Sequence, residues 1–355
     1  MYSRKLKQSF RKNWRHERSN YFYMNTLYLD IIGFLIATAV IVATGSRLSK
    51  YGDMMADMLG WGKMFVGIIL LASVTSMPEL MTGISSVVLL DAPDLAVGDI
   101  VGSCAFNILI ISIMDLFYDH KKPLTSVAQT GHVIAASFGI MLLSLVAFAI
   151  LMPDIFGTIV WIGELSILFL LLYLVAIRVI FLYDKKENNH QDEKKHSYPL
   201  SLNQVILRYA LNAVVLMGAA MLLPYFGEHL AEKSGLGQSF FGTLFIAAST
   251  SLPEVVVSIA AIRLGTIELA IGNIFGSNIF NIAILALDDI LYTKGPIFQF
   301  TSPNHIIPVL GTIIITAIGI IGIVFKEEKK WKLAIDTALI AVVYILMMGL
   351  LYYKR

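Results

Sequence analysis

Charge is what this sequence has little of. Asp, Glu, Lys and Arg together make up 15% of its 355 residues, whereas 57% of the residues are hydrophobic. A soluble domain carries about 25% charged residues, so the composition indicates a chain that lies largely in lipid. The net charge is only +2 and no nucleic-acid-binding motif is present; we therefore expect no nucleic-acid partner.

Cysteine and catalytic motifs are also scarce. Cys104 is the single cysteine, which excludes an internal disulfide framework. It stands in an apolar stretch, and we interpret it as a small packing residue. The sequence contains no HExxH, no GxSxG and no histidine near a Ser or Cys nucleophile. We therefore expect neither an enzyme nor a bound cofactor.

Long apolar runs are abundant instead. Because a hydrocarbon core of ~30 Å needs ~20 helical residues to cross it, a run of this length is typical of a membrane span. Lipid offers the backbone no hydrogen-bond partners, so the spans must be helices. The sequence predicts an all-α polytopic protein with ten spans, at residues 26–46, 62–90, 95–118, 126–151, 157–183, 202–225, 238–262, 267–292, 304–325 and 333–353.

A polar segment divides the chain midway. Residues 184–201 are the only substantial polar stretch between spans, and we interpret them as a linker between a first repeat (26–183) and a second repeat (202–355). A basic tail, residues 1–25, precedes both repeats. No apolar region with a small-residue cleavage site follows that tail directly, so we expect it to be retained, with the first span as an uncleaved signal anchor.

An internal repeat links the two halves. Residues 48–79 align without gaps on 223–254, with 12 of 32 positions identical, and 96–107 align on 270–281 with seven of 12 identical. The shared motifs are Thr-Ser-x-Pro-Glu and Gly-Ser-x-x-Phe-Asn, which chance similarity between apolar segments does not produce. Five spans separate the copies, so they enter the membrane in opposite senses. Inverted repeats with Pro-broken helices are typical of secondary transporters, whose site lies near the midplane.

The repeated polar residues predict a cation site. A carboxylate at mid-membrane costs ~2.5–3.5 kcal/mol on insertion scales, so two at matching positions indicate a function. All the repeated side chains offer oxygen, which hard cations such as Ca²⁺ prefer, and broken helices free backbone carbonyls as well. Glycines at 98, 102, 272 and 276 are expected to let the helices cross closely. The candidate side-chain ligands are Glu79, Glu254, Asn107, Asn281, Ser103, Ser277, Thr75, Thr250, Ser76 and Ser251.

Charge balance suggests exchange. Two ionised glutamates carry a charge of −2, which one Ca²⁺, two Na⁺ or two protons neutralise. Because an empty charged site is costly in a medium of low dielectric constant, such a site favours obligatory exchange of one divalent cation for two monovalent ones.

The motifs resemble the repeats of the calcium/cation antiporter superfamily, especially its prokaryotic sodium/calcium exchanger branch. The matching pieces are TSMPE (75–79), GSCAFN (102–107), TSLPE (250–254) and GNIFGSNIFN (272–281). The resemblance covers nearly the whole chain after residue 25. It implies that the polar residues above line alternate Na⁺ and Ca²⁺ sites, that Ala72 and Ala247 contribute backbone carbonyls, and that the first and sixth spans slide against a core of spans 2, 3, 7 and 8.

The sequence departs from that family pattern in places. Asn281 stands where some members carry Asp, which leaves two carboxylates in the site rather than three. Cys104 and Ala105 replace the Asn-Ile of the second copy, and Asp99 stands where that copy has Asn273. We expect Asp115, Asp288 and Asp289 to lie at span ends in the membrane interface, and His132 to be a packing histidine.

Two features of the sequence predict opposite orientations in the membrane. The family topology places both termini outside the cell, in a plasma-membrane protein. Loops after the odd-numbered spans, together with Lys63 at the start of the second span, carry 14 Lys and Arg, and the opposite side carries four, which agrees with that topology. The basic tail adds seven to the opposite side, against the positive-inside rule.

Three alternatives to Na⁺-coupled Ca²⁺ exchange remain. Two glutamates can carry two protons, so a proton-coupled exchanger of the same superfamily stays open. A cation channel needs sites along a continuous pore, which an inverted pair of broken helices favours less. An intramembrane enzyme lacks any motif. The expected partners are the transported cations and the lipid bilayer; the sequence indicates no oligomeric state.

Overall fold

The computed structural model describes residues 2–118, 122–188, 198–233, 249–326, 329 and 332–354, with side chains described from Tyr28 onward except at 188 and 228–233. Within these ranges, eight helices are long and apolar enough to cross a membrane, and a bent pair makes a ninth span. The tenth predicted span, 238–262, is described only from residue 249, where its last part forms α11 (Leu252–Arg263).

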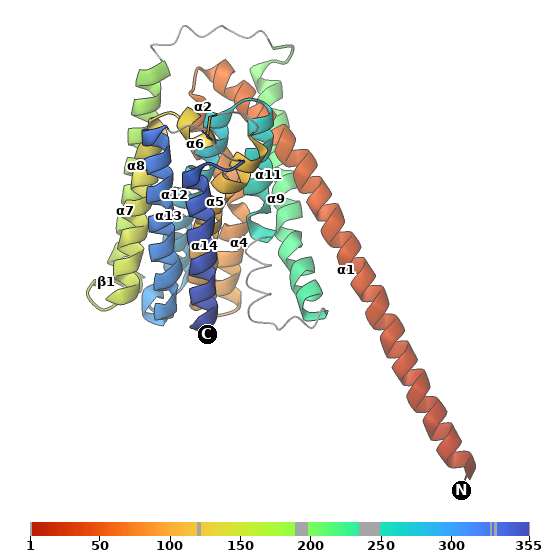
Figure 1. The fold of residues 1–355 in the computed structure, drawn as a ribbon. Coiled ribbons are helices and arrows are strands. Elements are labelled where there is room, and N and C mark those ends of the chain that lie inside the picture. The colour runs from red at the N-terminus through yellow and green to blue at the C-terminus, as the bar shows by residue number, and fades with distance from the viewer. Residues whose placement is uncertain are drawn as a thin grey trace.

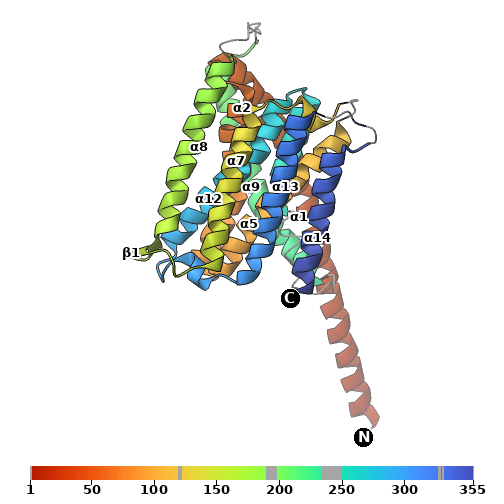
Figure 2. The same cartoon turned by 60° about the vertical axis from the view of Figure 1, so that its left-hand side comes forward.

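The protein is a bundle of helices that run side by side (Figures 1 and 2). The long elements are α1 (Tyr2–Leu59), α5 (Pro93–Phe117), α7 (Gly131–Leu151), α8 (Glu164–Asn188), α9 (Leu202–Lys233), α12 (Ile267–Leu291), α13 (Ile306–Phe325) and α14 (Ile335–Tyr353). The shorter elements are α2 (Lys63–Val66), η1 (Gly67–Leu71), α3 (Ala72–Thr75), α4 (Met77–Ile84), η2 (Ser85–Leu89), α6 (Leu124–Val127), β1 (Thr158–Ile159), β2 (Ile162–Gly163), η3 (Ile297–Phe300) and η4 (Pro303–His305).

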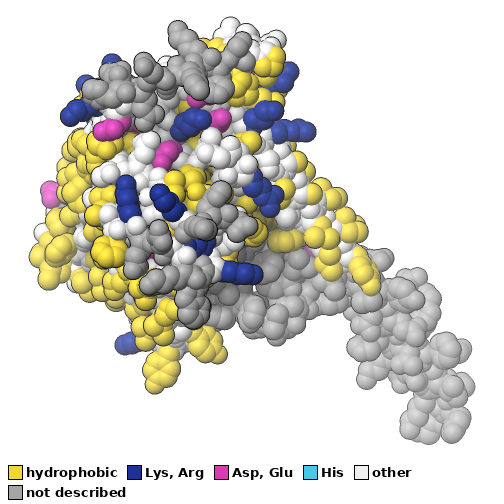
Figure 3. Space-filling view, turned by 45° about the horizontal axis from the view of Figure 1, so that its top comes forward, with side chains coloured by type: hydrophobic (Ala, Val, Ile, Leu, Met, Phe, Trp, Pro, Cys, Tyr) yellow, Lys and Arg dark blue, Asp and Glu magenta, His cyan; other side chains and the backbone are white. Residues whose placement is uncertain are grey.

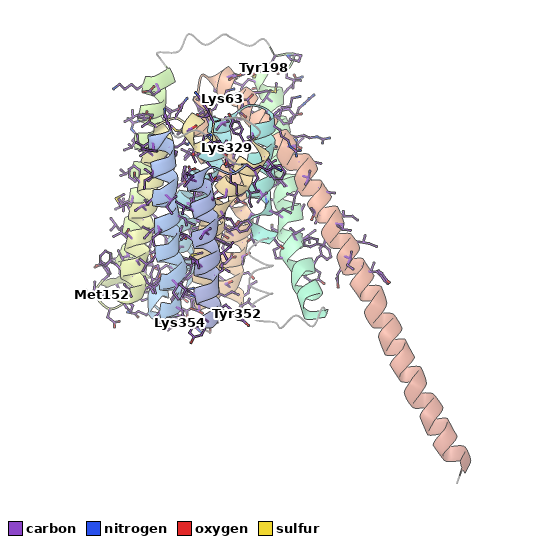
Figure 4. All side chains as sticks on the ribbon, in the orientation of Figure 1. Lys63, Met152, Tyr198, Lys329, Tyr352 and Lys354 are labelled. Atoms are coloured by element: carbon purple, nitrogen blue, oxygen red, sulfur yellow. The ribbon has the colours of Figure 1, made fainter. Side chains whose placement is uncertain are left out.

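Both chain ends lie on one side of the bundle, which we name the termini face (Figure 1). Met152, Tyr352 and Lys354 lie at this face, whereas Lys63, Tyr198 and Lys329 lie at the opposite one, named the linker face (Figure 4). The helix α5 runs from the termini face to the linker face and α12 runs back. The two repeats are therefore inverted, as the sequence predicts.

Helices α1 and α9 form a pair beside the rest of the bundle. They pack along each other, and α1 also contacts α11. The α1 helix leans away, so that its N-terminal end projects past the termini face (Figure 1). It begins at Tyr2, so the basic segment that the sequence sets apart as a tail continues the first span as helix.

The predicted breaks in the core helices are present. The helix axis bends by 41° between the segments Lys63–Thr75 and Met77–Leu89. The bend is at Ser76, where ψ is 11°. In the second half, Ser251 precedes α11 with a ψ of 5°. In each case a proline is the second residue of the next helix, a position where its missing N–H costs no intrahelical bond.

One predicted span begins later than expected. The sequence places the fifth span at 157–183, but residues 158–163 form a two-stranded hairpin that pairs Thr158 with Gly163, and α8 starts at Glu164. Val160 adopts a φ of 65° in this turn. Apolar composition alone predicts a helix here, and the turn overrides it.

The core helices cross at very short distances through glycine. A Cβ atom on Gly276 would lie 2.4 Å from the Ile68 carbonyl oxygen, and one on Gly272 would lie 2.7 Å from that of Met64. Gly67 faces the same crossing from η1. This confirms the predicted role of Gly272 and Gly276. The segment that Gly98 and Gly102 are expected to cross, the repeat counterpart of η1, falls within residues 234–248, outside the described residues, so the role of these two glycines stays a prediction.

Two aspartates predicted at span ends, Asp115 and Asp289, stand in the last turns of α5 and α12 and are fully buried by protein. Asp115 accepts hydrogen bonds from the Leu124 and Ala334 N–H groups at 3.0 and 2.9 Å. Asp289, at the same position of the second repeat, accepts from Gly163 and Ile297 N–H at 2.8 and 2.6 Å. Because unpaired backbone groups are costly in lipid, these aspartates hold the turns that follow their helices.

The glycine crossing gives a first prediction. Gly276→Ala places a methyl group against backbone that cannot move aside, and overpacking of this kind costs about 1–3 kcal/mol. We expect a lower thermal unfolding temperature in detergent, followed by intrinsic fluorescence. The control is Gly349→Ala, on an exposed part of α14, where the helix preference of alanine leaves the temperature unchanged or raised. Equal behaviour of the two variants would contradict the close crossing.

Candidate functional site

The predicted ligands meet at mid-bundle, where α3–α4, α5, α11 and α12 pack together. The ten side chains predicted as ligands are all fully buried, with 0% exposure: Thr75, Ser76, Glu79, Ser103, Asn107, Thr250, Ser251, Glu254, Ser277 and Asn281. They come from both repeats. Sequence positions about 170 residues apart therefore contribute to one polar centre inside an apolar bundle.

Each glutamate is contacted by the serine of the other repeat. The Ser76 hydroxyl donates to Glu254 Oε1 at 3.2 Å, and the Ser251 hydroxyl donates to Glu79 Oε1 at 3.5 Å. Ser251 and Ser103 hydroxyls lie 3.5 Å apart. The serines occupy the helix breaks, so the broken backbone is what brings each hydroxyl to the opposite carboxylate.

Thr75 connects the first broken helix to α12. Its hydroxyl donates to Asn273 Oδ1 at 3.2 Å and lies 3.4 Å from the Ser277 hydroxyl. Asn273 in turn donates through Nδ2 to the Ser258 hydroxyl at 3.1 Å. Neither Asn273 nor Ser258 is among the predicted ligands.

A second asparagine link joins α5 to α12. Asn107 Nδ2 donates to Asn278 Oδ1 at 3.0 Å, and Asn278 Nδ2 donates to the Cys104 carbonyl oxygen at 3.1 Å. Cys104 is buried, in agreement with a packing role. The motifs did not predict a role for Asn278. A signal was available in the repeat, because Asn278 aligns with Cys104. Two different residues at aligned positions indicate that only one copy supplies the side chain for a contact.

Several polar atoms of the centre have no hydrogen-bond partner among the described residues. They are Glu79 Oε2, Glu254 Oε2, Asn107 Oδ1, and both Asn281 Oδ1 and Nδ2. A buried polar group left unpaired costs about 1–3 kcal/mol, and a charged one costs more. Four of these five atoms are oxygens, and hard cations bind six to eight oxygens. The donor set therefore fits a hard cation without sulfur or imidazole ligands.

The structure describes one of the two alanines whose carbonyl groups the family resemblance implies as ligands. The Ala72 carbonyl oxygen accepts the Ser76 N–H at 3.0 Å and the Thr75 hydroxyl at 3.4 Å, so the helix already uses it. Ala247 lies outside the described residues.

Histidine–carboxylate pairs stand at both ends of the core. His132 Nε2 lies 2.6 Å from Glu268 Oε2 near the start of α12, and His305 Nε2 lies 2.9 Å from Asp94 Oδ1 near the start of α5. Asp94 and Glu268 occupy the same position of the two repeats. His132 is buried as expected, but it is also half of a repeated pair that links α7 to α12.

Comparison with known proteins places this chain in a protein family. A family model described as sodium/calcium exchanger protein matches residues 29–182 and 205–353. The inner membrane protein YrbG of Escherichia coli is 27% identical over 284 residues, covering 76% of this chain and 80% of its own. The sodium/calcium exchanger MaX1 of Methanosarcina acetivorans is 26% identical over 350 residues, covering 86% and 94%.

A solved structure has the same architecture. The sodium-calcium exchanger NCX_Mj superposes with a TM-score of 0.70 at 18% identity, over 91% of this chain and 99% of that chain. The match extends over both repeats, and it confirms the all-helical polytopic fold.

The asparagine link gives a second prediction. Asn278→Ala removes two hydrogen bonds between α5 and α12, each worth about 0.6 kcal/mol on average between membrane helices. We expect a lower thermal unfolding temperature in detergent. The matched control is Ser137→Ala, whose exposed hydroxyl bonds only to its own helix, at Val133 O. A decrease no larger than that of the control would show that Asn278 does not join the two helices.

Proposed function

The chain belongs to the sodium/calcium exchanger protein family, and from this premise we propose that it is a secondary antiporter that exchanges Ca²⁺ for Na⁺ at the centre built around Glu79 and Glu254. The family consists of membrane exchangers rather than enzymes. We propose as ligands the ten buried side chains described above, with Ala72 and Ala247 as backbone contributors.

The reciprocal arrangement of the glutamates supports this proposal most directly. Each carboxylate keeps one oxygen bonded to a serine of the opposite repeat and one oxygen without a partner among the described residues. Of the ion pairs within the described ranges, none includes either glutamate. A charge of −2 without a protein cation requires cations from solution, because isolated buried charges are unfavourable.

Alternating access follows from the position of α1 and α9. They lie together outside the core, and α1 meets the second broken helix where Ser49 Oγ donates to the Val257 carbonyl at 2.7 Å. Gly45 lies against Val256 at the same contact. We propose that this pair slides along the core and opens the site to one face at a time, as expected for inverted-repeat transporters.

Proton coupling is the second candidate. Two protons neutralise the two glutamates as well as two Na⁺ do. A channel is less well supported, because the polar groups gather at one centre rather than along a pore.

Surface charge supports a plasma-membrane orientation with the linker face in the cytosol. Lys and Arg side chains gather at that face, above the apolar sides of the bundle (Figure 3). Positive residues on the cytosolic side follow the positive-inside rule, and both termini then lie outside.

Transport gives the third prediction. Proteoliposomes loaded with Na⁺ and diluted into Na⁺-free buffer are expected to take up ⁴⁵Ca²⁺, whereas Glu79→Gln and Glu254→Gln lose uptake by about a hundredfold or more because half of the carboxylate charge is removed. Glu187→Gln, an exposed residue at the end of α8, is the control that retains uptake. Uptake driven only by a pH gradient would assign the chain to proton coupling, and normal flux in Glu254→Gln would refute the site.

Orientation gives the fourth prediction. In a Cys104→Ala background, Lys354→Cys is expected to react with a membrane-impermeant maleimide on intact cells, and Lys186→Cys only after permeabilisation. The two positions lie at opposite faces, so they serve as controls for each other. The reverse pattern would place the termini in the cytosol.

A further inference from the structure

Two aspartates outside the central site are buried and have carboxylate oxygens without a hydrogen-bond partner among the described residues. Asp288 has 0% exposure, and neither of its carboxylate oxygens has a hydrogen-bond partner among the described residues. Asp99 has 9% exposure, and its Oδ2 is likewise unpaired within that part of the chain. The sequence predicts Asp288 at a span end; it stands in the last turn of α12, and the complete burial of its side chain is what the sequence did not predict.

The aspartates lie on neighbouring helices near the termini face. Asp99 is on the first two turns of α5, and Asp288 is on the last turn of α12; these helices pack against each other and against α4. Asp99 stands one helical turn before Ser103 on α5, and Asp288 lies against Gly83, one turn from Glu79 on α4. The three carboxylates therefore form a series from the central site toward the termini face.

Two basic residues near this face contact other carboxylates. Lys294 forms an ion pair with Asp91, and His305 contacts Asp94 at 2.9 Å. Of the ion pairs within the described ranges, none includes Asp99 or Asp288. Two neighbouring carboxylates without a protein cation are unfavourable in an apolar interior, so the arrangement calls for a positive charge from solution.

Glycine makes room for the Asp288 carboxylate. A Cβ atom on Gly83 would lie 2.3 Å from Asp288 Oδ2 and 2.6 Å from Oδ1. Gly83 is in α4, one turn after Glu79. Any other residue at this position would displace the carboxylate.

The second repeat fills the corresponding space with neutral groups. There, Ser258 stands at the position of Gly83 and Asn273 at that of Asp99, and they are joined by a hydrogen bond of 3.1 Å. The repeat counterpart of Asp288 is Met114. The group Gly83, Asp99 and Asp288 thus differs from its repeat counterparts Ser258, Asn273 and Met114 at all three positions, with two carboxylates gained and one side chain lost.

We propose that Asp99 and Asp288 form a second site for a hard cation, over Gly83, between the central site and the termini face. Its ligands are carboxylate oxygens, which suit Ca²⁺. The placement on the transport path rests on the proposed function, whereas the binding of a cation does not. The site makes the two sides of the exchanger unequal, because a cation that enters from the termini face meets two additional carboxylates.

Direct binding measurements test this site apart from transport. In the full chain with Glu79→Gln and Glu254→Gln, purified in detergent, we expect equilibrium binding of ⁴⁵Ca²⁺ to retain one ion per protein. Adding Asp288→Asn is expected to weaken that binding by about tenfold or more, since one of two carboxylates is lost. Absence of Ca²⁺ binding before Asp288 is changed would overturn the proposal.

A second variant guards against misfolding. Gly83→Ser, Asp99→Asn and Asp288→Met together reproduce the arrangement of the second repeat, which the fold already accommodates. We expect this triple variant to lose the remaining Ca²⁺ with an unchanged elution volume in size-exclusion chromatography. The control is Asp154→Asn, in an exposed turn of the termini face, which retains the ion. Retention of the ion in the folded triple variant would refute the site.

Transport then separates this proposal from the preceding one. With Glu79 and Glu254 intact, Asp288→Asn is expected to raise the Ca²⁺ concentration for half-maximal uptake about fivefold from the termini face and to leave it unchanged from the linker face. An equal change on both faces would contradict the second site and leave the central site standing. Absence of Ca²⁺ uptake by the unmodified chain would refute the proposed function. Equilibrium binding of ⁴⁵Ca²⁺ would still decide the second site.

Discussion

Two buried carboxylates that form no ion pair within the described part of the chain are the constraint on which this structure depends. Glu79 and Glu254 lie in the middle of an apolar bundle, and the rest of the centre is arranged around them. The helix breaks place Ser76 and Ser251 across the repeat boundary, where each hydroxyl reaches the other copy's glutamate. The glycine crossing of η1 and α12 brings the two helices close enough for Thr75 to reach Asn273. Since burial of an unpaired charge is unfavourable, we propose that a cation from solution completes the folded centre.

The inverted repeat supplies a frame, and its deviations from symmetry supply specificity. Asp115 and Asp289 hold equivalent turns, and Asp94 and Glu268 hold equivalent histidines, so both copies preserve the same scaffold. Asn278 and Cys104 differ at one aligned position and create a link that only one copy provides. Gly83, Asp99 and Asp288 differ from their counterparts together. The single difference at Asn278 changes the packing of two helices. The three grouped differences change the charge of a buried position.

Much of the fold was predictable from the sequence, because lipid restricts the chain to helices of known length and the repeated motifs identify the inverted copies. Proline after serine marked the helix breaks. The sequence did not predict the hairpin at 158–163, since apolar composition does not distinguish a turn from the beginning of a span. It placed Asp115, Asp288 and Asp289 at span ends but did not predict their burial, because position along a helix does not reveal what packs over its end. The convergence of the ten polar side chains followed from the motifs, but Asn273, Asn278 and Ser258 required the three-dimensional contacts, and the role of all these residues in ion binding remains a proposal.

The paired histidines bear on how the molecule moves. His132 ties α7 to Glu268 of α12, and His305 ties the segment before α13 to Asp94 of α5. These contacts fasten each core helix to a flanking helix at opposite faces, so the core behaves mechanically as one block. If α1 and α9 slide against it, they do so over a largely apolar boundary, with the Ser49 hydroxyl as a cross-link to Val257. Turnover then encounters resistance mainly from the surrounding lipid, and bilayer viscosity and thickness become determinants of exchange rate alongside ion affinity.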